Sequence, residues 1–175
     1  MCSSDLDWAI PYGYDLVQAA RDAIENPTMW FKAGRVSYGY DGRAWLWCCL
    51  PSGRLLAYYQ PSFEWVTTPW GEEINALTSI WGGGKCKVGQ SWPRRPLTPG
   101  LLLENATQAT AADILRTAIV NACHAGIEVV GHVHDEIIAQ NTTEEELLKF
   151  VLDAPAWTAG LPIEAKPSSG IRYGK

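Results

Sequence analysis

Two acids and two histidines interrupt an apolar stretch in the run GHVHDEII, residues 131–138. The β-branched residues on either side predict two short strands, 127–133 and 136–139, which meet at a two-residue tip formed by His134 and Asp135. A tip of this length usually carries Asn-Gly or a similar pair. Carboxylates fit there when a cation meets them, and Mg²⁺ binds one or two carboxylates while it keeps water and substrate phosphates. The pattern indicates either a metal site built on Asp135 and Glu136 or two acids that are simply solvated in a turn.

The same run allows a second metal chemistry. His132 and His134 are two residues apart, which places two imidazoles on one face of a strand beside Asp135, a spacing that also suits Zn²⁺. The one other histidine in the chain is His124. A metal-dependent hydrolase that uses His132, His134 and Asp135 is therefore an alternative with few further ligands to draw on.

The helix that leads into the hairpin has the clearest pattern in the chain. Apolar residues recur at helical spacing from 105 to 125. Asn105 can cap its first turn, and Gly126 is placed to end it. A shorter amphipathic helix is expected over 14–25.

Further elements are expected beyond the hairpin. Thr142 or Thr143 precedes three glutamates, which favour the positive end of a helix dipole. We expect a helix from there to Asp153, followed by a last short strand over 163–165.

The part of the chain upstream of residue 105 is predicted to form strands followed by a loop. Short runs of aromatic and β-branched residues from 35 to 60 are broken by turn residues, which predicts an antiparallel meander with a hairpin turn at Asp41-Gly42. The stretch 61–100 is rich in proline and has no clear period, so we expect an irregular loop region there.

The composition fits one soluble domain: 175 residues, 47% of them apolar, with nine tryptophans. Five cysteines without a CxxC pair or a signal peptide indicate a reduced, cytoplasmic setting. A net charge of −5 argues against a free-standing nucleic-acid binder. Residues 74–103 are the exception, because they contain no acid and four basic residues, Lys85, Lys87, Arg94 and Arg95. These form either a solvated basic loop or a set of phosphate contacts.

Several blocks of the sequence carry a family resemblance. The run ENATQATAADIL at 104–115, followed by VHDEI at 133–137, resembles the last helix and the motif C hairpin of family A DNA polymerases, especially the phage-type branch. LPSGRLLAY at 50–58 resembles the strand that follows their fingers. Three short runs resemble their C-terminus, PAW at 155–157, GLPI at 160–163 and RYGK at 172–175. The resemblance covers 14–175, whereas residues 1–13 match nothing and are expected to be an artefact.

The resemblance implies an α+β fold: an antiparallel palm sheet with a motif C hairpin and helices packed mainly on one face. Asp135 would bind two catalytic Mg²⁺ ions, with Glu136 as an auxiliary acid or ligand at the rim. His134 would lie against the terminal nucleotide of the primer. Gln108 would contact the minor groove of the primer-template duplex, as would Asn105, for which a helix cap is an equal explanation. The candidates for phosphate contacts are Arg54, Arg94 and Arg95.

Two parts of such an enzyme are missing from the sequence. A two-metal site needs a second aspartate, on motif A, and a fingers helix whose Arg and Lys hold the nucleotide, and neither is found. The chain alone is therefore expected not to polymerise DNA. Its expected partners are primer-template DNA, a deoxynucleoside triphosphate and either a missing N-terminal portion or a second copy of itself. The other alternative is a non-catalytic, nucleic-acid-binding remnant of a palm.

Overall fold

The computed structural model describes residues 7–81 and 92–173, which form an α+β fold with antiparallel sheets. The chain divides into two compact units, Met1–Gln108 and Ala109–Lys175. In order, the elements are α1 (Ala9–Glu25), β1 (Trp30–Ala33), β2 (Val36–Tyr40), β3 (Trp45–Cys49), β4 (Leu55–Thr67), β5 (Glu73–Ile80), β6 (Arg94–Pro96), α2 (Pro99–His124), β7 (Glu128–Val133), β8 (Glu136–Gln140), α3 (Glu144–Leu152) and the 3₁₀ turn η2 (Ala156–Thr158). Among the helices that the structure describes, none has the length and apolar character that crossing a bilayer requires.

The first unit is built on a six-stranded antiparallel sheet in which β1 to β6 follow one another in chain order. The meander expected over 35–60 is confirmed and begins earlier, at Trp30. Its turn at Asp41-Gly42 is also confirmed. The Asp41 carboxylate accepts hydrogen bonds from the backbone N–H groups of the three residues that follow Gly42, at 2.8 to 3.0 Å.

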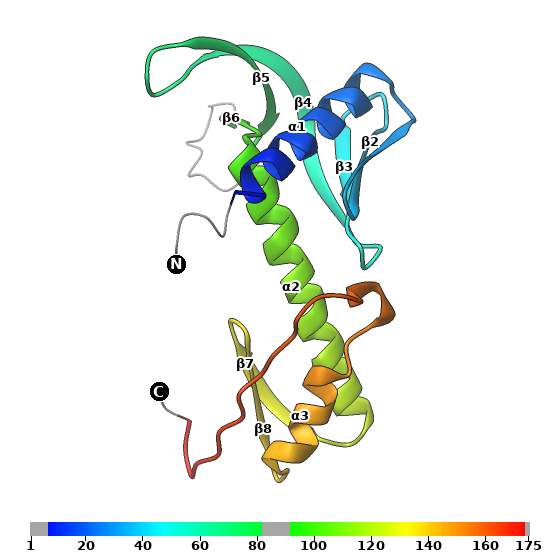
Figure 1. The fold of residues 1–175 in the computed structure, drawn as a ribbon, viewed down its shortest axis with the longest axis vertical. Helices are drawn as coiled ribbons and strands as arrows, with labels where there is room; N and C mark the ends of the chain where they lie inside the picture. The colour runs from blue at the N-terminus through cyan, green and yellow to red at the C-terminus, as the bar shows by residue number, and fades with distance from the viewer. Residues whose placement is uncertain (1–6, 82–91, 174–175) are drawn as a thin grey trace. The chain divides into compact units, whose positions relative to one another are not determined.

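The helix α1 covers one face of β1, β2 and β3 (Figure 1). It starts at Ala9, five residues before the expected start, so it begins inside the segment expected to be an artefact. Its buried side chains recur at helical spacing and face the buried residues of the sheet. The fully or nearly fully buried set comprises Leu16, Ala19, Ala20 and Ala23 from the helix with Ala33, Val36, Tyr38, Leu46 and Cys48 from the strands.

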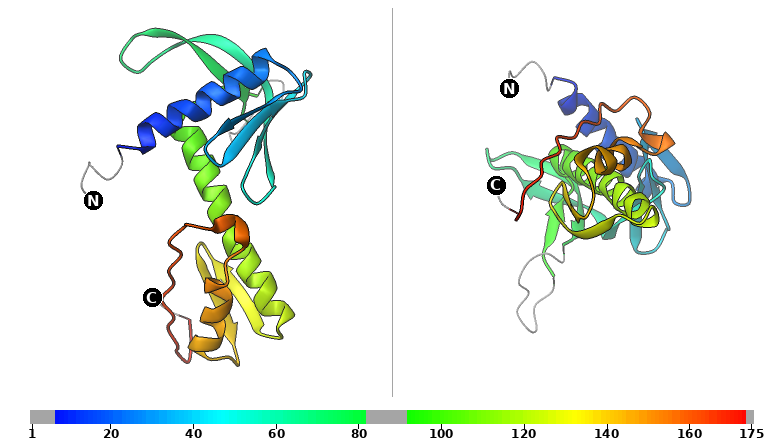
Figure 2. Two further views of the ribbon diagram at one scale, coloured as in Figure 1. Left: turned by 45° about the vertical axis from the view of Figure 1, so that its right-hand side comes forward. Right: turned by 90° about the horizontal axis from the view of Figure 1, so that it is seen from below.

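The prediction of an irregular loop over 61–100 is wrong. The strand β4 continues to Thr67 and pairs with β5 along its far half, and β6 then pairs with β5. The sheet curls at this long pair (Figure 2). Pro61 does not end the strand because it lies at a register shift between Tyr59 and Ser62, where a residue without an N–H is tolerated. The glycine-rich part of the predicted loop lies outside the described residues.

The helix α2 starts at Pro99, six residues before the expected start. The side chain of Thr98 accepts from the backbone N–H of Leu101 at 3.3 Å, so threonine caps the helix and proline occupies its first position. Asn105 is therefore not a helix cap, and that explanation is withdrawn. The predicted end of the helix is confirmed, since Gly126 follows it with φ 86°.

The second unit contains the rest of α2, the hairpin and α3. The hairpin is confirmed as a separate two-stranded sheet of β7 and β8, joined at His134 and Asp135. The helix α3 lies beside it (Figures 1 and 2). Thr143 caps α3 by accepting from the N–H of Glu146 at 3.2 Å, as expected. The strand expected over 163–165 is wrong, because no strand in the described part of the chain pairs with it.

Candidate functional site

The tip of the β7–β8 hairpin holds the three residues to which catalysis was assigned. His134 has a φ of 53°, in the left-handed region that glycine or asparagine usually occupies. Asp135 follows it and is exposed. Glu136 begins β8 opposite Val133 and is half-buried. The hairpin therefore presents Asp135 to solvent at its end and keeps Glu136 closer to the body of the unit.

Glu136 has a hydrogen-bond partner from the end of the chain. The phenolic hydroxyl of Tyr173 donates to Oε2 of Glu136 at 2.8 Å. This contact joins two of the blocks that carry the family resemblance, although 37 residues separate them. The base of the hairpin is closed by a second carboxylate, since the side-chain amides of Gln140 and Asn141 both donate to Glu128.

The ligands available at the tip decide which metal fits it. Within the residues that the structure describes, no three side chains of His, Cys, Asp or Glu come together as a metal cluster. A Zn²⁺ site needs three or four protein ligands, so the hydrolase alternative has no ligand set in these residues. Mg²⁺ needs only one or two carboxylates, with the remaining positions taken by water and phosphate oxygens. The exposed Asp135 carboxylate suits that demand as one part of a site.

Asn105 and Gln108 lie one turn apart on α2, within the first unit. Gln108 is exposed. Asn105 is half-buried and donates from Nδ2 to the hydroxyl of Tyr58 on β4 at 3.2 Å. Burial raises the pKa of Tyr58 to about 12. The Tyr58 contact fixes the orientation of the Asn105 side chain.

A hollow of about 290 Å³ opens between β4, β5, β6 and the start of α2. Arg95 and Asn105, two of the five predicted DNA contacts, both line it. The Arg95 guanidinium lies 5.4 Å from the ring centroid of Trp81, which is 43% exposed. Ser79 and Tyr58 add two hydroxyls to the lining. The first unit thus gathers a cation, an exposed aromatic ring and polar groups in one place.

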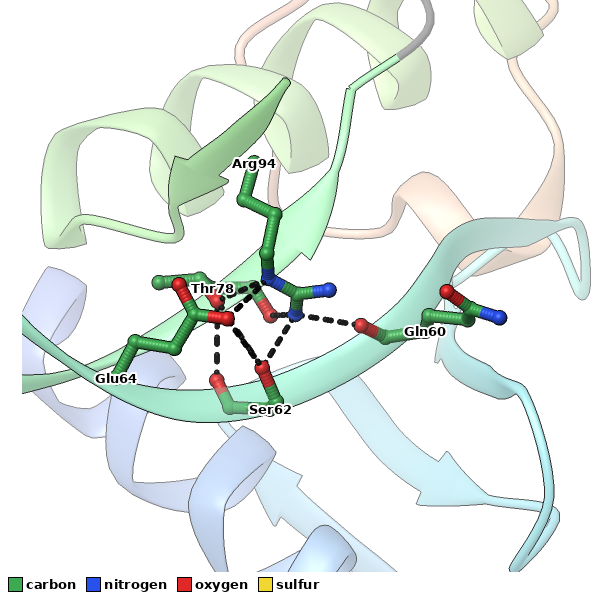
Figure 3. Close-up of polar contacts among 5 residues, drawn as sticks. All are labelled: Gln60, Ser62, Glu64, Thr78 and Arg94. Atoms are coloured by element: carbon green, nitrogen blue, oxygen red, sulfur yellow. Dashed lines mark hydrogen bonds and ion pairs between the residues drawn. The ribbon is translucent and has the colours of Figure 1, made fainter. Parts of the chain in front are cut away.

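Arg94 is the neighbour of Arg95 in β6, and its side chain points to the other side of β5 and β6. Contacts with residues of β4 and β5 hold it there (Figure 3). Its Nε donates to the Thr78 hydroxyl at 3.0 Å and pairs with Glu64 at 2.6 Å. One terminal nitrogen donates to the Gln60 carbonyl at 2.6 Å and to the Ser62 hydroxyl. Arg94 therefore fastens the irregular part of β4 to β5 and β6.

Arg54, the remaining candidate, lies in the tight turn before β4. Its carbonyl accepts from the N–H of Leu50, and its own N–H donates to the Ser52 hydroxyl. The eight candidates thus fall into two sets. The first unit holds Arg54, Arg94, Arg95, Asn105 and Gln108, and the second unit holds His134, Asp135 and Glu136.

Three residues of these sites were not predicted individually. Tyr58 lay in the LPSGRLLAY block, yet nothing in the sequence indicated its contact with Asn105, and no local pattern marks Trp81. Tyr173 lay in a block whose resemblance was noticed, yet nothing in the sequence indicated its contact with Glu136.

The chain is similar in sequence to part of a known protein. The chain is 32% identical over 160 residues to a DNA polymerase of Bacillus phage SP02, which covers 89% of this chain and 24% of that protein. The chain therefore resembles one part of a polymerase and spans about a quarter of its length. No family model matches the chain. No solved structure matches it either.

Proposed function

We propose that this chain is the C-terminal part of the palm of a family A DNA polymerase. In this proposal it contributes motif C to a reaction that transfers a nucleotide to the 3′-hydroxyl of a primer. The similarity to a phage DNA polymerase carries the proposal, because it runs over 89% of the chain. The exposed Asp135 at the hairpin tip supports the assignment of motif C.

Asp135 has the chemistry for a Mg²⁺ ligand in the assembled site. Its carboxylate is exposed at the end of two antiparallel strands, so a metal and a substrate phosphate can approach it from solvent. When bound, a pair of Mg²⁺ ions would activate the primer hydroxyl and stabilise the leaving pyrophosphate. The chain's own contribution is a fixed negative charge. The second aspartate must come from a part of the polymerase that this sequence lacks.

Glu136 follows Asp135 in the hairpin and is held by Tyr173. The Tyr173 hydroxyl donates to one oxygen of Glu136, so it directs the carboxylate and limits its rotation. In the proposal Glu136 is an auxiliary acid at the rim of the site. His134, at the tip itself, would contact the last nucleotide of the primer.

The start of α2 would bind the primer-template duplex. Gln108 is exposed and can donate to the acceptors of the minor groove, which are similar for all base pairs. Asn105 lies one turn earlier, and its amide is oriented by Tyr58. Contacts of this kind recognise the duplex without reading its sequence.

Primer extension with Mg²⁺ and all four nucleotides tests the proposal. The proteins compared are this chain, a longer form that supplies motif A and the fingers, and the longer form with Asp135→Asn. We expect extension by the longer form only, and a loss on the order of a thousandfold on Asp135→Asn. Asp153→Asn is the matched control, because Asp153 is another exposed acid of the second unit.

Two results would contradict the proposal. One is a folded longer form that binds primer-template DNA but extends nothing. The other is an Asp135→Asn protein as active as its parent. In either case, the non-catalytic nucleic-acid-binding alternative takes its place.

A further inference from the structure

The face of the sheet turned away from α1 carries a group of aromatic rings. Side chains of a strand alternate between the two faces, and cross-strand partners share a face. One row of cross-strand partners runs from β1 to β4 and consists of Trp30, Gly39, Trp47 and Ala57. In the neighbouring row, Trp45 pairs with Tyr59. We call the surface formed by Trp30, Trp45, Trp47 and Tyr59 the aromatic face.

The rings of the aromatic face are arranged against one another. The centroids of Trp45 and Tyr59 are 4.7 Å apart, and those of Trp45 and Trp47 are 5.7 Å apart with an interplanar angle of 29°. Trp45 is 37% exposed and Tyr59 38%. The rings fix one another in place while each keeps a part of its surface in solvent.

Gly39 extends the face towards the edge of the sheet. Trp30, which is 52% exposed, lies over Gly39, and a Cβ at this glycine would be 2.7 Å from the indole. The absence of a side chain at Gly39 therefore lets the Trp30 ring lie close to β2. Because Gly39 also pairs with Trp47, the two tryptophans flank the glycine on the same face.

The segment that carries the aromatic face differs in charge from the whole chain. From residue 26 to 63 the sequence has four basic residues and one acid, Asp41, whereas the whole chain has a net charge of −5. The Asp41 carboxylate accepts three backbone hydrogen bonds in its turn. Lys32 shares the face with Trp30, and Arg43 lies exposed in the turn just before Trp45. Exposed rings and cations thus occur together, a combination that suits a polyanion with aromatic bases.

We propose that the aromatic face binds single-stranded DNA by stacking unpaired bases on Trp45, Tyr59 and Trp30. Lys32 and Arg43 contact the phosphates. Bases in a duplex already stack on each other, so only an unpaired strand can offer its base faces to these rings. The choice of DNA rests on the proposed function, since a polymerase handles an unpaired template strand.

The fluorescence anisotropy of a labelled oligo(dT) of about 16 nucleotides measures the binding. The full chain is titrated at low salt, beside its Trp45→Ala/Tyr59→Ala variant. We expect the variant to lose about tenfold or more in affinity. A Trp45→Phe/Tyr59→Phe variant keeps flat rings at both positions and should stay within about threefold of the unchanged chain.

The matched controls are Trp65→Ala and Trp70→Ala. Both tryptophans are 73% exposed, more than any ring of the aromatic face, and acids lie beside them at Glu64, Glu72 and Glu73. Neither change should weaken oligo(dT) binding. Duplex DNA of the same length should bind more weakly than oligo(dT). Circular dichroism of each variant confirms that the sheet is retained.

Several results would overturn the inference. These are no binding of oligo(dT) by the unchanged chain, an equal loss in the Trp65→Ala control, or tighter binding of oligo(U) than of oligo(dT). A fourth is a double variant that abolishes self-association in sedimentation velocity without changing DNA affinity, which would make the face a protein interface. The titration needs no catalysis, whereas the primer-extension test of the proposed function depends on it. Its failure is therefore distinguishable from failure of the proposed function.

Discussion

The two units of this chain differ in two respects: the first holds most of the apolar core, and the second carries the motif that suggests a reaction. Among the described residues, fifteen of the eighteen buried apolar side chains belong to the first unit and three to the second, Ala118, Ala122 and Ile127. The second unit is also the more acidic, with nine acids against five basic residues, whereas the first has ten against nine. Yet the motif that suggests a reaction lies in the second unit.

The difference teaches that the chemically recognisable segment need not be the one that stabilises the fold. In β7, β8 and α3 every described side chain is at least partly exposed. Hydrophobic stabilisation scales with the apolar area removed from water, so the hairpin gains little from burial. The hairpin therefore depends more on side-chain hydrogen bonds, such as those at Glu128 and Glu136.

The largest expected contrast is in thiol reactivity. Cys48 in β3 is fully buried, and burial raises its pKa from 9.0 to about 11, whereas Cys123 of the second unit is exposed. A rise of about two units leaves about a hundredfold fewer thiolates at pH 8, and the thiolate is the reactive form. We therefore expect Cys123 to be alkylated at least about a hundredfold faster than Cys48 in site-resolved mass spectrometry. Similar rates would mean that the first unit opens as readily as the second.

Truncation of one apolar residue in each sheet gives the next largest contrast. Leu46 in β3 is 0% exposed, whereas Ile138 in β8 is half-buried. Leu46→Ala should lower the free energy of unfolding of the first unit by about 2–5 kcal/mol, and Ile138→Ala should cost about 1 kcal/mol or less in the second. Urea unfolding followed by tryptophan fluorescence reports on the first unit, which holds eight of the nine tryptophans. Equal costs in the two units would contradict the comparison.

Arg94 tests whether polar contacts also stabilise the first unit. Arg94→Met removes the ion pair with Glu64 and the hydrogen bonds to Thr78 and Gln60. Because the side chains of Arg94 and Glu64 are 25% and 41% exposed, solvent weakens the pair, and we expect a loss of about 1–2 kcal/mol in urea unfolding. Arg95→Met is the control, since Arg95 is exposed, and should change stability by no more than about 0.5 kcal/mol. A larger loss of stability for Arg95→Met than for Arg94→Met would contradict the role of Arg94 in fastening β4 to β5 and β6.

The smallest expected effect lies in the second unit, at the start of α3. Thr143→Ala removes the cap on the N–H of Glu146 and should cost about 1 kcal/mol, which faster amide hydrogen exchange in α3 would reveal. Thr143→Ser keeps the accepting oxygen and should restore slow exchange. Thr142→Ala is the neighbouring control, because its hydroxyl donates to the exposed side chain of Glu146. An effect of Thr142→Ala as large as that of Thr143→Ala would argue against capping.

The sequence predicted the elements whose signals are local. The β7–β8 hairpin, the cap at Thr143, the turn at Asp41 and the end of α2 at Gly126 all depend on a few neighbouring residues. The start of α2 was missed although its signal is equally local. Thr98-Pro99 is a cap followed by a proline at the first helical position, but the apolar periodicity from 105 onwards drew the predicted start downstream.

The far half of the sheet could not be predicted because its determinants are not local. Proline argued against a strand over 61–100, and only the pairing of β4 with β5 explains why Pro61 is tolerated. The orientation of Asn105 by Tyr58 and of Glu136 by Tyr173 joins positions 47 and 37 residues apart. The sequence thus named Asp135, Glu136 and Asn105 as candidates, and the structure added the residues that contact them.

The left-handed backbone of His134 bears on any attempt to stabilise this chain. An L-residue with a Cβ in that conformation costs about 1 kcal/mol relative to glycine, so a redesign guided by stability alone would replace His134 by Gly or Asn. Such a replacement would remove the imidazole proposed to meet the primer. Selection for folding and selection for the proposed primer contact would therefore favour different residues at this one position, and variants recovered from a stability screen should lose His134 before they lose Asp135.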